Sequence, residues 1–300
     1  MKKLVLTLAL CAAFSAGAQV VNVSGIERVN LPEDAATQVA AISPAGDYLL
    51  LSTDTHQGLT KLDLATGERT VITNATGAGY NVRISEDGNN IVYRQTSIND
   101  KKLRQVAVQN YNVVTHATEQ LVKPTRELQA VQVTGNTATT VTKGKAKAKS
   151  LDGTKAVKAT MAYATQNYEL MVNVNGKARQ LTPLGAGKRY IWVSLSPNGE
   201  KVLFFVSGDA AYVCNIDGTG LQKLGMLHAA KWLNDNVVVG MNDKDNGEVY
   251  TSSEIVAVNL QGQRQVLTGN DMIAMYPQCG GDKIAFTTDA GEVYMINLTK

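Results

Sequence analysis

SLSPNGEKVLFFVSGDAAYVCNIDGTGLQKL, residues 194–224, contains a turn, an apolar strand, a Gly-Asp break, a second strand, an Asp-Gly turn and a short third strand. Its opening turn, Ser196-Pro197-Asn198-Gly199, has the residues that a type I turn favours. The pattern recurs at Ser43-Pro44-Ala45-Gly46 and, without the proline, at Ser85-Glu86-Asp87-Gly88. Each turn precedes a short apolar run such as YLLLS, NIVYR or KVLFFV. Such runs are typical of buried strands.

A second feature recurs later in each unit, where an Asp or Asn follows an alternating strand. These residues are Asp63, Asn110, Asn173, Asn215, Asn259 and Asn297, at spacings of 47, 63, 42, 44 and 38 residues. Repeats of this length with about four strands each are typical of propeller blades. The turns mark six units, the last of them incomplete, and a β-like segment, VVNVSGIERV (20–29), precedes the first. The sequence therefore predicts an all-β, six-bladed β-propeller of four-stranded blades, with the last blade closed by the N-terminal strand.

The N-terminus, MKKLVLTLALCAAFSAGAQ, has two lysines, a short apolar core and a small-residue cleavage site. This order predicts a signal peptide over residues 1–18, cut after Ala18, and its apolar core is too short to span a bilayer. We expect the mature chain, 19–300, to be a single propeller domain, periplasmic or secreted, without a transmembrane segment. Removal of Lys2 and Lys3 lowers the formal net charge from +3 to +1. A balance so close to neutral does not predict nucleic-acid binding.

Three stretches, ISPAGDYLLLS, residues 194–224 and GGDKIAFTTDAGEVYMINL, resemble the WD-like repeats of TolB-type six-bladed propellers. The propeller domain of dipeptidyl peptidase IV-type enzymes is similar. The resemblance covers essentially the whole mature chain and is weakest in the third unit. It implies protein–protein interaction in a bacterial cell envelope. TolB-type proteins also carry an N-terminal α/β domain, whereas here only about 20 residues of the expected mature chain precede the first predicted blade.

The longest spacing contains KGKAKAKSLDGTKAVK (143–158), with six lysines and one aspartate. We interpret this segment as a solvated insertion in blade three. The alternative is an electrostatic contact with acidic envelope material, made by Lys143, Lys145, Lys147 and Lys149.

Catalytic motifs do not emerge from the sequence. No serine lies in a G-x-S-x-G elbow, and the peptidase that accompanies dipeptidyl peptidase IV-type propellers has no counterpart. Oligogalacturonate lyase-type propellers, a further resemblance, hold a metal through inward-facing histidines. The histidines here, His56, His116 and His228, fall at different radii of the predicted blades. We therefore expect no catalytic residue, no metal site and no cofactor.

A ligand would bind at the mouth of the central channel, where inner strands begin. Counting back from each turn places Gln38, Tyr80, Gln129, Tyr190, His228 and Tyr276 at this mouth, with Arg83 and Trp192 slightly further along. Tyrosines and a histidine at equivalent places would form an amphipathic rim, and such residues are favoured at binding hot spots. The alternative is that these aromatics pack between blades.

These observations lead to one functional hypothesis and one alternative. The sequence predicts a monomeric, non-catalytic protein-interaction or scaffolding propeller of the bacterial cell envelope, with a protein or peptide partner. The alternative is a carbohydrate-binding or carbohydrate-active, lyase-like propeller that holds a glycan at the channel mouth.

Overall fold

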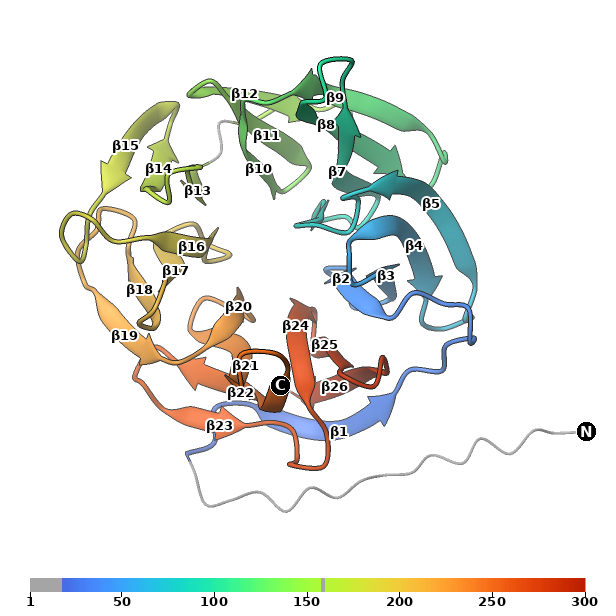
Figure 1. The fold of residues 1–300 in the computed structure, drawn as a ribbon, viewed down its shortest axis with the longest axis vertical. Helices are drawn as coiled ribbons and strands as arrows, with labels where there is room; N and C mark the ends of the chain where they lie inside the picture. Colours follow the sequence, from blue (N-terminus) through green and yellow to red (C-terminus); the bar gives the residue numbers. More distant parts are fainter. Residues whose placement is uncertain (1–17, 158–159, 300) are drawn as a thin grey trace, which may run out of the picture.

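The strands of the protein form a ring of radially arranged sheets (Figure 1). The computed structural model describes residues 18–157 and 160–299, which form 26 strands in seven sheets. Residues 1–17 of the predicted signal peptide lie outside this part of the chain. Within the described residues, no helical segment has the length and hydropathy of a membrane span. The fold is an all-β propeller, and the prediction of six blades is wrong.

The first four blades follow one another around the ring. Blade one consists of β2 (Gln38–Ile42), β3 (Tyr48–Ser52), β4 (Gln57–Asp63) and β5 (Arg69–Thr76). Blade two consists of β6 (Arg83–Ile84), β7 (Asn90–Ile98), β8 (Arg104–Asn112) and β9 (Thr118–Thr125). Blade three consists of β10 (Leu128–Thr134), β11 (Thr137–Thr142) and β12 (Lys145–Ser150). Blade four consists of β13 (Met161–Ala164), β14 (Leu170–Val174) and β15 (Lys177–Leu181).

The last three blades complete the ring. Blade five consists of β16 (Tyr190–Leu195), β17 (Lys201–Val206), β18 (Ala211–Asn215) and β19 (Gln222–Gly225). Blade six consists of β20 (His228–Trp232), β21 (Val237–Asp245), β22 (Tyr250–Asn259) and β23 (Arg264–Val266). Blade seven consists of β24 (Ala274–Gly280), β25 (Lys283–Thr288), β26 (Val293–Thr299) and, on its outer edge, β1 (Asn22–Arg28).

The seventh blade explains the 63-residue spacing, because two three-stranded sheets, blades three and four, lie where the sequence predicted one blade with an insertion. The hairpin between β13 and β14 shows that these strands correspond to the second and third strands of the other blades. Its Thr165 N–H donates to Glu169 O over 3.0 Å, as Thr53 N–H donates to Gln57 O between the second and third strands of blade one. Blade four thus begins, among the described residues, with the equivalent of a second strand, and blade three ends with its third.

Residues 145–150 of the lysine-rich segment form strand β12 of blade three, so this part of residues 143–158 belongs to the blade and is not an insertion into it. Lys145, Lys147 and Lys149 lie on one face of β12, because side chains alternate along a strand. Lys149 forms an ion pair with Glu119 on β9 of blade two. At least one lysine of this segment thus forms a contact between neighbouring blades.

The Ser-x-x-Gly turns connect the first two strands of their blades as expected. Ser196 Oγ accepts a hydrogen bond from Lys201 N–H at 3.0 Å, and Gly199 N–H donates to Ser196 O at 2.9 Å. Gly199 has a φ of 74°, a left-handed conformation that glycine adopts without steric penalty. Ser43 and Ser85 accept equivalent bonds.

The hydrophobic core consists of clusters between adjacent blades, and in the described residues each of the seven junctions has one. Side chains alternate along β17, so that Phe204 packs toward blade four and Phe205 toward blade six. The second strands are consequently buried on both faces. This explains why runs such as KVLFFV are continuously apolar.

The ring is closed by the N-terminal strand. β1 pairs antiparallel with β26, so that the first and last described strands share one sheet (Figure 1). Val20 N–H and Val21 N–H donate to Gln265 Oε1 of blade six at 2.6 and 2.9 Å. The N-terminal segment therefore joins blades six and seven.

The two ends of the ring differ. One end, which we call the hairpin face, carries the hairpins between the second and third strands, at residues 53–56, 99–103, 165–169 and 246–249 among others. Every inner strand except β13 begins at this face, because it runs antiparallel to the second strand that leads into the hairpin. The hairpins of blades two and six are the longest, with strands of nine or ten residues.

The packing of blade four can be tested at Leu170, whose side chain is 0% exposed in β14. We expect Leu170→Ala to lower the free energy of unfolding by about 2–5 kcal/mol, because it leaves a cavity between blades four and five. Chemical denaturation monitored by circular dichroism measures this change. Val157→Ala, at an exposed position before β13, is the matched control. A cost for Leu170→Ala no greater than that of the control would show that residues 161–181 are not a packed blade.

Candidate functional site

The inner strands are irregular at corresponding points near the hairpin face. A register shift interrupts β16 between Ile191 and Ser194, β20 between His228 and Lys231, and β24 between Met275 and Gln278. Within these bulges Trp192, Ala229 and Tyr276 have φ values of 52°, 48° and 54°. Bulges redirect side chains, and left-handed backbone at non-glycine residues costs about 1–3 kcal/mol each. Such strain is concentrated at functional sites, which makes the side chains around these bulges candidates for a binding site.

On blades five to seven the bulges bring an aromatic cluster together. The ring centroid of His228 lies 5.4 Å from that of Trp192 and 4.7 Å from that of Phe205. His228 Nδ1 lies 2.7 Å from Asp243 Oδ1, whose side chain is almost fully buried on β21. The carboxylate therefore holds the imidazole in position and leaves Nε2 as the nitrogen available to a ligand.

Two tyrosines extend this cluster. Tyr250 OH and Tyr276 OH lie 3.3 Å apart. Burial raises the pKa of Tyr250 well above its usual range, and the bond to Tyr276 and the charge of Asp243 act in the same direction. The Tyr250 phenol is therefore protonated at neutral pH and serves as a hydrogen-bonding group.

Blade two presents a second aromatic group across the ring. Tyr80 is 54% exposed, and its ring centroid lies 5.4 Å from that of His56. The Arg94 guanidinium lies 5.7 Å from the Tyr80 ring centroid, and its Nη1 donates to Asn81 O at 3.0 Å. Asn81 has a φ of 53°, like the bulged residues of blades five to seven.

Two cations meet at the centre of the ring. Arg83 lies on β6 of blade two and Lys231 on β20 of blade six. Burial, with a smaller contribution from the charge of Arg94, lowers the pKa of Arg83 to about 10. Burial, followed by the charge of Arg83, lowers the pKa of Lys231 to about 8. Blades two and six lie on different sides of the ring, so this repulsion acts across its centre (Figure 1).

The structure brings most of the expected rim residues to the hairpin face. Tyr80, Trp192, His228 and Tyr276 lie near the starts of their inner strands, as predicted, and Gln38 begins β2. Gln129 Oε1 accepts a hydrogen bond from Gly144 N–H at 2.7 Å and so ties β10 to the β11–β12 hairpin of its own blade.

Tyr190 begins β16, but it follows the alternative in which the aromatic side chain packs between blades. Its side chain is 2% exposed and packs edge-on against Phe204, at 5.3 Å between ring centroids, in the core between blades four and five. Tyr190 precedes the bulge of β16, where regular alternation directs it inward. Trp192, two residues later, is turned outward and is 47% exposed.

Sequence reasoning missed Arg94, Lys231, Asp243 and Tyr250. Three of these belong to second or third strands of blades two and six, whose lengthened hairpins bring them above the inner strands. Lys231 could have been recognised as a single cation in the apolar inner-strand sequence HAAKW.

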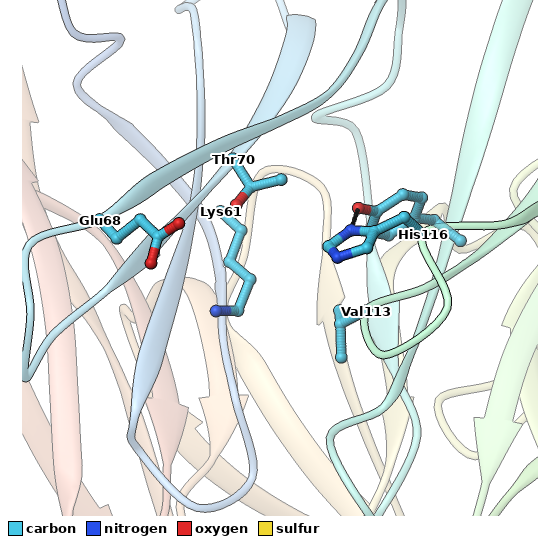
Figure 2. A pocket seen from close by; sticks show the side chains of 6 residues that line it. Lys61, Glu68, Thr70, Val113 and His116 are labelled. Carbon is cyan, nitrogen blue, oxygen red and sulfur yellow. Dashed lines mark hydrogen bonds between the residues drawn. The ribbon is translucent and has the colours of Figure 1, made fainter.

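A separate cleft of about 230 Å³ lies between blades one and two, away from the ring centre (Figure 2). It is lined by Lys61, Glu68, Thr70, Tyr111, Val113 and His116. His116 Nδ1 lies 2.7 Å from Tyr111 OH, and Lys61 Nζ lies 3.9 Å from Asp63 Oδ2. Tyr111 and His116 are thus paired with each other, and the cleft lies apart from the strained bulges of the inner strands. We therefore regard the ring centre as the stronger candidate.

Among the described residues, no group of three or more His, Cys, Asp or Glu side chains is placed to hold a metal ion.

Comparison with known proteins shows the fold alone. No protein-family model matches the chain. No curated protein matches it in sequence. Among solved structures, it is similar to streptogramin B lyase, at 11% identity over 91% of this chain and 97% of that one, with a TM-score of 0.60. It is also similar to the β-propeller domain of the Trilobed protease from Pyrococcus furiosus, at 12% identity over 84% and 91%, with a TM-score of 0.56.

TolB from Acinetobacter baumannii is a third similar structure, at 17% identity, with a TM-score of 0.50. The match covers 77% of this chain and 54% of TolB, so the chain spans about half the length of that protein. The Trilobed protease propeller is described as having an open velcro topology, whereas here β1 closes the ring.

The burial of Lys231 predicts a pH dependence of stability. Its pKa is about 8 in the folded protein against an ordinary value of 10.5, so between these values the unfolded chain binds more protons. The free energy of unfolding should therefore rise as the pH increases from about 8 to 10.5. The groups that face Lys231 are Arg83, which stays charged, and Cys279, whose pKa burial raises to about 12.

Guanidinium denaturation of the wild type and of Lys231→Met at pH 7 and pH 10 measures this effect. The variant should be more stable than the wild type at pH 7, and the difference should shrink at pH 10. If the free energy of unfolding changed with pH by the same amount in both proteins, Lys231 would not be a buried cation without a counter-ion.

Proposed function

We propose that this protein is a non-catalytic interaction module of the bacterial cell envelope, exported by its N-terminal signal, that binds a protein or peptide partner on the hairpin face. The export signal and the envelope location rest on the sequence and on the resemblance to TolB-type propellers. The binding face rests on the distribution of exposed side chains.

One observation carries the proposal: several blades each expose large apolar side chains on the hairpin face. They are Tyr80, Ile98, Leu103, Tyr168, Trp192, Met226 and Val249. Contiguous apolar surface on a folded protein marks interaction sites, and aromatic residues and methionine are enriched at protein interfaces. Ile98 and Val249 expose aliphatic side chains at the ends of their hairpins, where they can contact the apolar side chains of a peptide.

The geometry of His228 supports a binding role. Its ring is packed by Trp192 and Phe205, and its Nδ1 is held by Asp243. An imidazole fixed in this way presents a rigid hydrogen-bonding edge, and rigid groups lose little conformational entropy when a partner binds.

A carbohydrate is the second candidate ligand. Trp192 and Tyr80 are partly exposed near the starts of their inner strands, and such rings combine an apolar face with a polar tip. The aliphatic side chains beside them favour the protein partner over this alternative.

Crosslinking tests the proposal. A tagged protein of residues 19–300 is recovered from the cell envelope after mild crosslinking, alongside the double variant Tyr80→Ala/Trp192→Ala. Recovery of a discrete partner should fall about tenfold or more in the variant, because aromatic anchors account for most of the binding energy at interfaces.

The control is Val71→Ala/Val114→Ala, which removes apolar side chains that are 63% and 68% exposed but lie away from the hairpin face. Recovery should be unchanged in this control. Equal recovery in all three proteins would refute the hairpin face as the binding surface. Recovery of glycan without a protein partner would support the carbohydrate alternative.

A further inference from the structure

The innermost strands of the seven described sheets contain no aspartate or glutamate, although the chain has 26 acidic residues. They do contain Arg83 and Lys231. Charged residues are costly so close to the centre of a fold unless they are paired. The inner wall of the ring is therefore cationic without a carboxylate of its own.

Polar side chains occupy one equivalent position in these strands, two residues before the turn into the second strand. The pairs Arg83–Val92, Ser194–Leu203, Lys231–Val239 and Gln278–Ala285 show that the register is the same in blades two, five, six and seven. We call Arg83, Ser194, Lys231 and Gln278 the donor ring, because each side chain can donate a hydrogen bond. Blade one has Ala41 at this position.

Within the described part of the chain the donor ring lacks a counter-ion, and Arg83 Nη1 donates only to the neighbouring Val82 O, at 3.3 Å. None of the ion pairs there includes Arg83, Arg94 or Lys231. Ser194 Oγ is buried and has no hydrogen-bond partner. Asp243, the acidic group beside the ring centre, is already bound to His228.

The two cationic blades also carry the longest hairpins of the hairpin face. Ile98 and Leu103 lie at the tip of the β7–β8 hairpin, and Val249 lies at the tip of the β21–β22 hairpin. An extended segment that crosses from blade two to blade six would contact both tips and pass over the donor ring. The apolar tips and the cationic centre together match a segment with aliphatic and acidic side chains.

We propose that the donor ring is an anion site that binds a carboxylate from an acidic segment of the partner protein, while the hairpins of blades two and six hold the aliphatic side chains of that segment. This inference rests on the proposed function, whose face and partner class it specifies. Arg83 and Lys231 supply the charge, and Ser194 and Gln278 supply neutral donors. Hydrogen bonds between such cations and a carboxylate are among the strongest in proteins.

Binding to defined probes tests the inference. Isothermal titration calorimetry of residues 19–300 uses acetyl-Leu-Glu-Leu-Glu-Leu-Glu with a free carboxyl terminus, and its counterpart with glutamine and a terminal amide. The acidic peptide should bind at least about tenfold more tightly. Lys231→Met and Arg83→Gln should each remove most of this preference, since each removes a charge that faces the ligand. Lys145→Gln/Lys147→Gln, which removes two exposed lysines of β12, should leave it unchanged.

Thermal unfolding separates a binding role from a structural one. Without ligand, Lys231→Met should raise the melting temperature by about 2 °C or more, because it removes an unpaired and repelled charge while keeping the side-chain volume. A lower melting temperature would show that Lys231 has a stabilising partner within the chain, and would overturn the inference.

The remaining outcomes separate the inference from the proposed function. One outcome would refute the anion site alone. In it, envelope capture depends on Tyr80 and Trp192 but is unchanged in Lys231→Met, and the protein binds the acidic peptide no more tightly than its glutamine counterpart. The proposed interaction module would then still stand. Binding of trigalacturonate without binding of the acidic peptide would overturn the peptide as the ligand. Loss of capture in Lys231→Met, with the folded state retained, supports the inference even where the probe peptides bind weakly.

Discussion

The pairing of β1 with β26 is the interaction on which the rest of the structure depends. Each blade is an open sheet, and its faces are buried only because a neighbouring blade covers each of them. Without β1, blade seven would expose β26 as an unpaired edge at the point where the ring begins and ends. The same N-terminal segment also bonds Gln265 of blade six. One segment thus fastens two blades at the seam.

Closure of the ring determines which side chains face one another at its centre. In a closed ring the inner strands surround one axis, so side chains from blades on different sides face one another. Arg83 and Lys231 are brought together in this way, and the lowered pKa of Lys231 reflects first its burial and then the charge of Arg83. Each fully buried aliphatic or aromatic side chain contributes about 1.5–3 kcal/mol, and all seven junctions contain several of them. The clusters between blades therefore outweigh the repulsion between two cations. Groups that lower stability without a structural benefit are typical of binding sites.

The repeat was predictable wherever its turns kept their residues. Ser43, Ser85 and Ser196 marked blades one, two and five, and the β-like segment before the first turn indicated closure by the N-terminal strand. Blades three and four could not be separated, because β12 reads KAKAKS, which looks like a solvated loop, and β13 has only four residues.

Positions along an inner strand were less predictable than the strand itself. A fixed count from the turn cannot foresee a bulge, and the bulge in β16 is what turns Trp192 outward while Tyr190 stays buried. Asp243 and Tyr250 could not be assigned to the site from sequence, since only the long hairpin of blade six brings them beside His228. Lys231 was visible in the sequence, but its significance depends on Arg83, which is distant along the chain.

The most direct test of this account is the formation of a disulfide across the seam. Asn22 and Thr299 are directly opposed in the β1–β26 register and both are exposed, which suits a bridge between the two strands. Burial raises the pKa of the native Cys214 thiol to about 11, so that it stays unreactive. Asn22→Cys/Thr299→Cys should form an intramolecular bridge under mild oxidation and melt at a higher temperature. The off-register pair Asn22→Cys/Asn297→Cys should do so far less. Failure of the first pair to bridge, or equal bridging by both, would contradict closure of the ring by the N-terminal strand.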